Sequence, residues 1–152
     1  MQETTLCYLE HQGSYLMLQR NKKQNDPNLN KWIGVGGHLL DNESPDECLV
    51  REVKEETGLI LDDYKLRAIV TFTSNIFECE QMYLYTADKF HGALIECDEG
   101  SLKWIKKDEI TNLNLWQGDR VFLDLIRQDS KFFTLKLVYE NDNLVQQILK
   151  FH

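Results

Sequence analysis

The sequence predicts an α/β/α sandwich, with two helices packed on a mixed sheet. Two observations predict the helices: a segment with helix-start and helix-stop signals at 45–57, and a second amphipathic segment at 118–128. A third observation, a series of short apolar runs bounded by turn residues, predicts the strands. The chain has 152 residues, of which 42% are hydrophobic, so we expect one domain over residues 1–152 with a sizeable core.

The predicted strands cover most of the chain outside the two helices. Residues 4–10 and 14–20 are expected to form a hairpin around His11-Gln12-Gly13. A polar loop over 21–31 follows, in which Pro27 excludes a regular helix. Further strands are expected at 65–74, 80–90 and 102–105, then a helical turn starting at Asp108, and finally a hairpin of 132–140 and 144–151.

The helix at 45–57 has the clearest local signals. Ser44-Pro45-Asp46-Glu47 is a capping box with proline at the first helical position, so the helix is expected to begin there. Good helix formers continue to Thr57, and Gly58 can adopt the left-handed conformation that ends a helix.

Three glutamates of this helix are spaced so that their carboxylates share one face. Glu52, Glu55 and Glu56 stand at i, i+3 and i+4, and like charges at these spacings repel one another. Arg51 or a divalent cation with oxygen ligands could compensate them. A solvated acidic helix is the alternative, but it leaves the glycine-rich run Gly34-Val35-Gly36-Gly37 before the helix unexplained.

This stretch resembles the Nudix box at every defined position. Gly37 is followed after five residues by Glu43, and after seven more by Arg51-Glu52-Val53-Lys54-Glu55-Glu56-Thr57-Gly58-Leu59. The resemblance implies the Nudix fold and hydrolysis of a nucleoside diphosphate linked to another moiety, assisted by Mg²⁺ or Mn²⁺.

The expected roles follow from that chemistry and from the resemblance. We assign Glu52, Glu55 and Glu56 to the metal cluster, and the resemblance adds the backbone carbonyl of Gly36 and the carboxylate of Glu99, with Glu96 and Asp98 as alternatives. Glu52 or Glu56 could also accept a proton from water, and the sequence leaves that choice open. Arg51 is expected to orient the carboxylates, with Glu43 as its structural partner.

The resemblance also extends to the MutT/MutX-type 8-oxo-dGTP diphosphatases, over nearly the full chain. The segments that carry it are 31–38, 96–104 and Leu115-Trp116-Gln117-Gly118-Asp119. It implies release of a nucleoside monophosphate and pyrophosphate from an oxidised purine nucleotide. The substrate contacts that we expect are Arg20, Lys23, Gly37 and His38 near the phosphates, and Trp116 and Asp119 around the base, with Phe72 as a possible wall of the pocket.

Each of these residues also has a purely structural interpretation. The basic side chains of the 21–31 loop can be solvated, Trp116 and Phe72 can belong to the core, and Asp119 can cap its helix. The chain also departs from the animal relatives: Ile33 replaces a base-reading asparagine, Gly118 replaces one of two paired acids, and His38 replaces a frequent lysine. Substrate selectivity is therefore less well determined than the reaction class.

Net charge, apolar runs and cysteine spacing indicate which kinds of partner and which cellular location to expect. The formal net charge of −8 argues against stable nucleic-acid binding. There is no apolar run of membrane-spanning length and no basic leader, and the four cysteines have no CxxC spacing, so we expect a cytoplasmic protein with reduced thiols. The expected partner is a small nucleotide and a monomer is favoured. ADP-ribose, another nucleotide sugar or an RNA 5′ end remain alternative substrates, and a noncatalytic nucleotide sensor is the alternative function.

Overall fold

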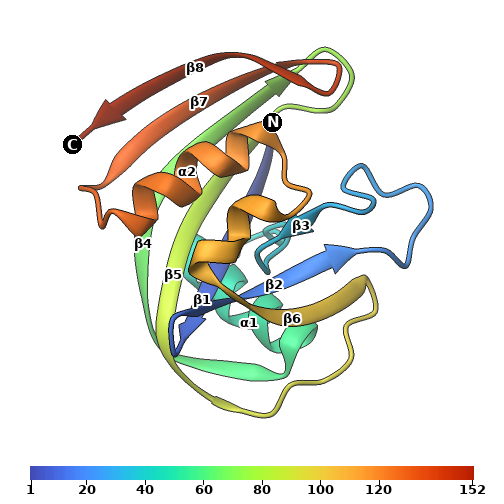
Figure 1. Ribbon diagram of the computed structural model, residues 1–152, viewed down its shortest axis with the longest axis vertical. Coiled ribbons are helices and arrows are strands. Elements are labelled where there is room, and N and C mark those ends of the chain that lie inside the picture. Colours follow the sequence, from blue (N-terminus) through green and yellow to red (C-terminus); the bar gives the residue numbers. More distant parts are fainter.

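The structure is a computed structural model that describes residues 1–152, and Figure 1 shows one helix in front of the curved strands and another behind them. The strands are β1 (Gln2–His11), β2 (Ser14–Arg20), β3 (Trp32–Ile33), β4 (Leu59–Ser74), β5 (Glu80–Gly92), β6 (Gly100–Lys106), β7 (Phe133–Glu140) and β8 (Asn143–Phe151). The helices are α1 (Pro45–Thr57) and α2 (Gln117–Arg127), and a 3₁₀ helix, η1, covers Lys107–Asn112. No helix is long and apolar enough to cross a membrane.

The strands form a mixed sheet in the order β3-β2-β1-β5-β4-β7-β8, with β6 paired to β2. β1 runs parallel to β5 and β4 runs parallel to β7, whereas β4 with β5 and β7 with β8 are antiparallel. The expected hairpin of the first two strands exists only at its turn, where Glu10 pairs with Tyr15 and His11 with Ser14. The strands then diverge, because β1 pairs along its length with β5 and β2 pairs with β6.

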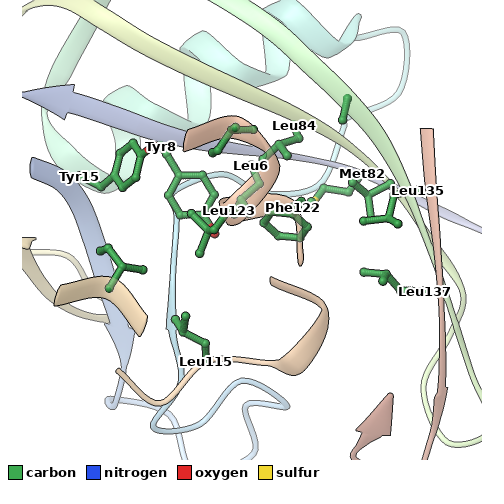
Figure 2. Close-up of a cluster of buried hydrophobic side chains, with 14 of the residues drawn as sticks. Leu6, Tyr8, Tyr15, Met82, Leu84, Leu115, Phe122, Leu123, Leu135 and Leu137 are labelled. Atoms are coloured by element: carbon green, nitrogen blue, oxygen red, sulfur yellow. The ribbon is translucent and has the colours of Figure 1, made fainter. Parts of the chain in front are cut away.

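The two helices cover separate apolar clusters, which confirms the predicted sandwich. One cluster gathers Phe122, Leu123 and Ile126 of α2 with strand residues such as Tyr8 and Leu84. Figure 2 shows Phe122 and Leu123 of this cluster among the labelled strand side chains, and the rings of Tyr8 and Phe122 are 6.3 Å apart. The other cluster joins Leu49 and Val53 of α1 to residues such as Leu9 and Tyr85. β1 supplies alternate residues to both clusters.

The boundaries of α1 are those that the sequence predicts. The Ser44 hydroxyl accepts the backbone N–H of Glu47 at 3.2 Å, and the Glu47 carboxylate accepts that of Ser44 at 3.0 Å. Gly58 ends the helix in the left-handed region with φ 78°. This reciprocal cap fixes where α1 starts, and so fixes which residues of 45–57 face the sheet.

Several other boundaries differ from prediction, among them the starts of β4 and α2. β4 begins at Leu59, immediately after α1, rather than at residue 65, and register shifts interrupt its pairing with β5 between Leu61 and Ala68. These bulges disrupt the alternation of apolar residues from which strands are recognised. α2 begins at Gln117, one residue before the predicted start at Gly118, and Trp116 is its N-cap residue.

Candidate active site

Arg51 on α1 is the centre of a network of charge-assisted hydrogen bonds. Its guanidinium donates to both oxygens of Glu43 at 2.7 and 2.9 Å, to Glu52 at 2.7 Å and to Glu55 at 3.3 Å. It also donates to the backbone carbonyl of His38 at 3.1 Å, which ties α1 to the glycine-rich segment. The hydrogen bonds from Arg51 lower the pKa of Glu43 to about 2, so that carboxylate stays ionised. The contacts expected of Arg51 and Glu43 are therefore present.

Glu56 faces the glycine-rich segment and is almost entirely buried, with 7% of the residue exposed. Its Oε1 accepts the backbone N–H of Gly36 at 2.9 Å, while its Oε2 is buried and has no hydrogen-bond partner. Burial, followed by the charges of Glu99 and Glu52, raises the pKa of Glu56 to about 8. A buried oxygen without a partner, close to other acids, is the environment in which a cation would be stabilising.

The glycine-rich segment presents backbone groups to these acids. The carbonyls of Val35 and Gly37 accept the amides of Cys7 and Thr5 on β1. The backbone N–H of Gly36, between these two residues, meets the Glu56 carboxylate instead. A Cβ at position 37 would lie 2.5 Å from the Glu52 carboxyl carbon, so a larger residue there would displace the Glu52 carboxylate.

The predicted metal ligands are brought to one region but do not form a closed cage. No group of three acidic, histidine or cysteine side chains is spaced to hold an ion as placed. Glu52 is bonded to Arg51, Glu55 is 60% exposed, and the Glu99 carboxylate pairs with Arg20 at 3.2 Å and Lys23 at 3.8 Å. The donor set fits a hard divalent cation. Such an ion would have to compete with Arg51 for Glu52 and with Arg20 for Glu99.

A cavity of about 390 Å³ opens beside this acidic region. Arg20 and His38, two of the predicted phosphate contacts, line it. Arg20 also donates to the Asp26 carboxylate at 2.6 Å, so two acids already partner its charge. His38 hydrogen-bonds the side chain of Gln2. Lys23 does not line the cavity, and its side chain is 61% exposed.

The two residues predicted to contact a base, Trp116 and Asp119, also line the cavity, and so does Phe72. The Trp116 indole N–H donates to the side-chain oxygen of Asn28 at 2.8 Å, and the Lys31 ammonium lies 4.8 Å from its ring centre. Trp116 is half-buried and packs on the α2 cluster, so its core role and its exposure to the cavity coexist.

Asp119 does not cap α2, so that structural alternative is wrong. It is the third residue of the helix, and the helix start has no side-chain cap. Asp119 is 5% exposed and lines the cavity. Burial and then the charge of Glu80 raise its pKa to about 7, while Lys31 opposes this shift.

Much of the cavity wall was not predicted from the sequence, and Asn28 and Tyr139 are two examples. Asn28 belongs to the polar 21–31 loop, and its backbone N–H donates to the Asp26 carboxylate at 2.9 Å. Tyr139 lies in β7, where alternation indicates only that it is buried. Their positions depend on contacts with Trp116 and with the start of α2, and no local signal in the sequence indicates those contacts.

Comparison with known proteins agrees with this geometry. A model of the NUDIX domain matches residues 2–126. The uncharacterized Nudix hydrolase YvcI of Bacillus subtilis is 30% identical over 83% of this chain and 79% of its own. The oxidized purine nucleoside triphosphate hydrolase of Mus musculus is 29% identical over 67% of this chain and 66% of its own.

The fold is likewise similar to that of solved structures. A crystal structure of a MutT protein from Bacillus halodurans superposes with a TM-score of 0.88 at 24% identity, covering 99% of this chain and 98% of the other. The family model covers both the glycine-rich segment and all of α1, where the arginine–carboxylate network lies. The chain therefore belongs to the Nudix family of hydrolases.

Proposed function

We propose that this chain hydrolyses oxidised purine nucleoside triphosphates with the help of Mg²⁺, converting 8-oxo-dGTP to 8-oxo-dGMP and pyrophosphate. Nudix hydrolases act on small nucleotides and generally use divalent cations. The name of the mouse relative supports this substrate class. The proposal places the activity in the cytoplasm, as sanitisation of the nucleotide pool.

The observation that carries the proposal is the position of Arg20 between the two parts of the site. Arg20 lines the cavity that contains Trp116 and Asp119, and it pairs with Glu99, whose charge acts on Glu56. A nucleotide with its base beside Trp116 would thus direct its phosphates toward the carboxylates of α1. A purine ring can stack on the indole of Trp116, and the Asp119 carboxyl group can hydrogen-bond the edge of the base.

The acidic residues have distinct proposed tasks. A divalent cation held by Glu52, Glu55, Glu56, Glu99 and the Gly36 carbonyl would neutralise charge on the polyphosphate and position water for attack. Glu56 is buried against Gly36, and its Oε2 has no hydrogen-bond partner. It is therefore the carboxylate best placed to accept, at Oε2, the proton that the attacking water releases. Arg51 keeps Glu52 and Glu43 in fixed orientations, which preserves the geometry needed for in-line attack.

A substrate panel with product identification tests the proposal. Purified protein would be assayed with Mg²⁺ at limiting enzyme against 8-oxo-dGTP, dGTP, ADP-ribose, a nucleotide sugar and a 5′-triphosphorylated RNA. We expect 8-oxo-dGTP to have the highest kcat/KM, with monophosphate and pyrophosphate as products in equal amounts. Preference for ADP-ribose or for the nucleotide sugar would reject the substrate assignment, and release of single phosphates would reject the reaction.

A further inference from the structure

Tyr139 connects the C-terminal hairpin to the cavity wall. It belongs to β7, beyond residues 2–126 that the family model matches. Its hydroxyl oxygen accepts the backbone N–H of Gly118, in the first turn of α2, at 2.7 Å. Its ring packs edge-on against that of Trp116, with centres 5.7 Å apart. One side chain of β7 thus contacts the segment that carries both base-side residues, Trp116 and Asp119.

The same contact explains why residue 118 is glycine. A Cβ at this position would lie 2.7 Å from the Tyr139 hydroxyl and 2.6 Å from Cδ1 of Leu137, the neighbouring inward residue of β7. The space that a side chain at 118 would occupy is therefore filled from β7. A side chain at 118 would have to displace Leu137 and Tyr139, and the polar group that stands in that space is a hydroxyl.

The Tyr139 hydroxyl also has hydrogen-bonding capacity to spare. Its oxygen accepts from Gly118, so its own hydrogen is free to point elsewhere. Tyr139 lines the cavity with Asp119, and burial together with the Asp119 charge raises the pKa of Tyr139 to about 12. The hydroxyl thus remains a donor at neutral pH, beside a carboxyl group that can accept or, when protonated, donate.

We propose that Tyr139 is a specificity-determining residue of the cavity: it fixes the first turn of α2 through Gly118 and donates its hydroxyl hydrogen to a carbonyl oxygen on the edge of a bound oxopurine. The inference rests on the proposed function for its ligand class. It assigns to β7 a recognition task that position 118, as glycine, cannot perform.

The test compares Tyr139→Phe with the parent enzyme and with Tyr64→Phe. The first substitution removes one hydroxyl from the cavity wall, and the second removes one from a tyrosine outside the cavity, whose ring packs edge-on against Tyr85. For 8-oxo-dGTP we expect Tyr139→Phe to raise KM roughly 5- to 50-fold, the range for one lost hydrogen bond to a bound ligand, with kcat changed less than about threefold. For dATP, whose base has no carbonyl oxygen, KM should rise less than about threefold. Tyr64→Phe should match the parent with both nucleotides.

Calorimetric titration with 8-oxo-dGMP separates this inference from the proposed hydrolysis, because this nucleotide carries the base but no pyrophosphate bond. Weaker binding by Tyr139→Phe than by the parent supports the inference even if no triphosphate is cleaved. Equal binding by the two proteins overturns it even if 8-oxo-dGTP is hydrolysed. An equal loss of kcat with every nucleotide would also overturn it, since that pattern indicates a general structural role.

A second variant reaches the same contact from the other side. Gly118→Ala keeps the Tyr139 hydroxyl but introduces a Cβ that pushes against it. The inference requires the same selective increase in KM for 8-oxo-dGTP, with a circular dichroism spectrum like that of the parent. A folded Gly118→Ala protein with unchanged selectivity between 8-oxo-dGTP and dATP would contradict it.

Discussion

Replacing Asp119 by asparagine should flatten the dependence of folding stability on pH. In the folded protein, burial and then the charge of Glu80 raise the pKa of Asp119 from 3.8 to about 7, against the opposing charge of Lys31. In the unfolded chain the carboxyl group is hydrated and its pKa is about 3.9. The folded state therefore binds this proton more tightly, and stability falls as the pH rises from about 4 to about 7.

The size of the effect follows from the two pKa values. About three pH units at about 1.36 kcal/mol each correspond to roughly 4 kcal/mol over the whole interval, of which about 2.5 kcal/mol falls between about pH 5 and about pH 8. Asparagine keeps the shape of the carboxyl group without its charge. Over the same pH range, the free energy of unfolding should therefore decrease in both proteins, but by about 2.5 kcal/mol less in Asp119→Asn than in the parent. Glu56, whose pKa is also raised, titrates in both proteins and cancels in the difference.

Urea unfolding with EDTA at the two pH values measures this difference directly. Asp124→Asn, at an exposed position of the same helix, is the matched control and should follow the parent at both pH values. Parallel pH dependence of the parent and Asp119→Asn would refute the reasoning, because it would mean that Asp119 gives up its proton in the folded state as readily as in water.

Three further substitutions test the acidic region and its helix. Glu56→Gln should keep the fold but lower kcat for 8-oxo-dGTP at least about 100-fold, whereas Glu109→Gln, at an exposed position, should leave kcat unchanged. Turnover of Glu56→Gln near the parent rate would remove Glu56 from its proposed role. Arg51→Lys cannot reproduce the bidentate hydrogen bonds to Glu43, so kcat/KM should fall roughly 10- to 100-fold. Measuring the rate as a function of Mg²⁺ concentration tests this, and an unaltered Mg²⁺ dependence would show that the network is dispensable. Ser44→Ala breaks the capping box of α1 and should lower the free energy of unfolding by about 1 kcal/mol in urea; an unchanged midpoint would mean that the cap adds nothing.

The parts of this structure that the sequence predicts well are those determined by neighbouring residues. α1 is one example, because its cap, its apolar positions and its terminating glycine all lie within 44–58. The co-location of Glu52 and Glu56 follows from the same helix, and the glycine-rich segment that meets them is close by in the chain. A short stretch thus carries most of the information about the acidic half of the site.

The parts that escaped prediction depend on distant partners. The early start of β4 is obscured by bulges that only its pairing with β5 reveals. Asn28 and Tyr139 enter the cavity wall because separate elements meet Trp116 and Gly118 there. Asp119 shows the same dependence on its surroundings. It does not cap the helix because Trp116 occupies the N-cap position, which local preference for a polar cap does not indicate.

The alternation of β1 has a consequence for how the molecule assembles. Leu6 and Tyr8 enter the cluster under α2, and Cys7 and Leu9 enter the one under α1, so a slip by one position would exchange the occupants of both clusters at once. The backbone of β1 also aligns Val35 and Gly37, and with them Gly36 against Glu56. The same slip would therefore separate Gly36 from Glu56, so correct packing of both clusters and the arrangement of the acidic region form together or not at all.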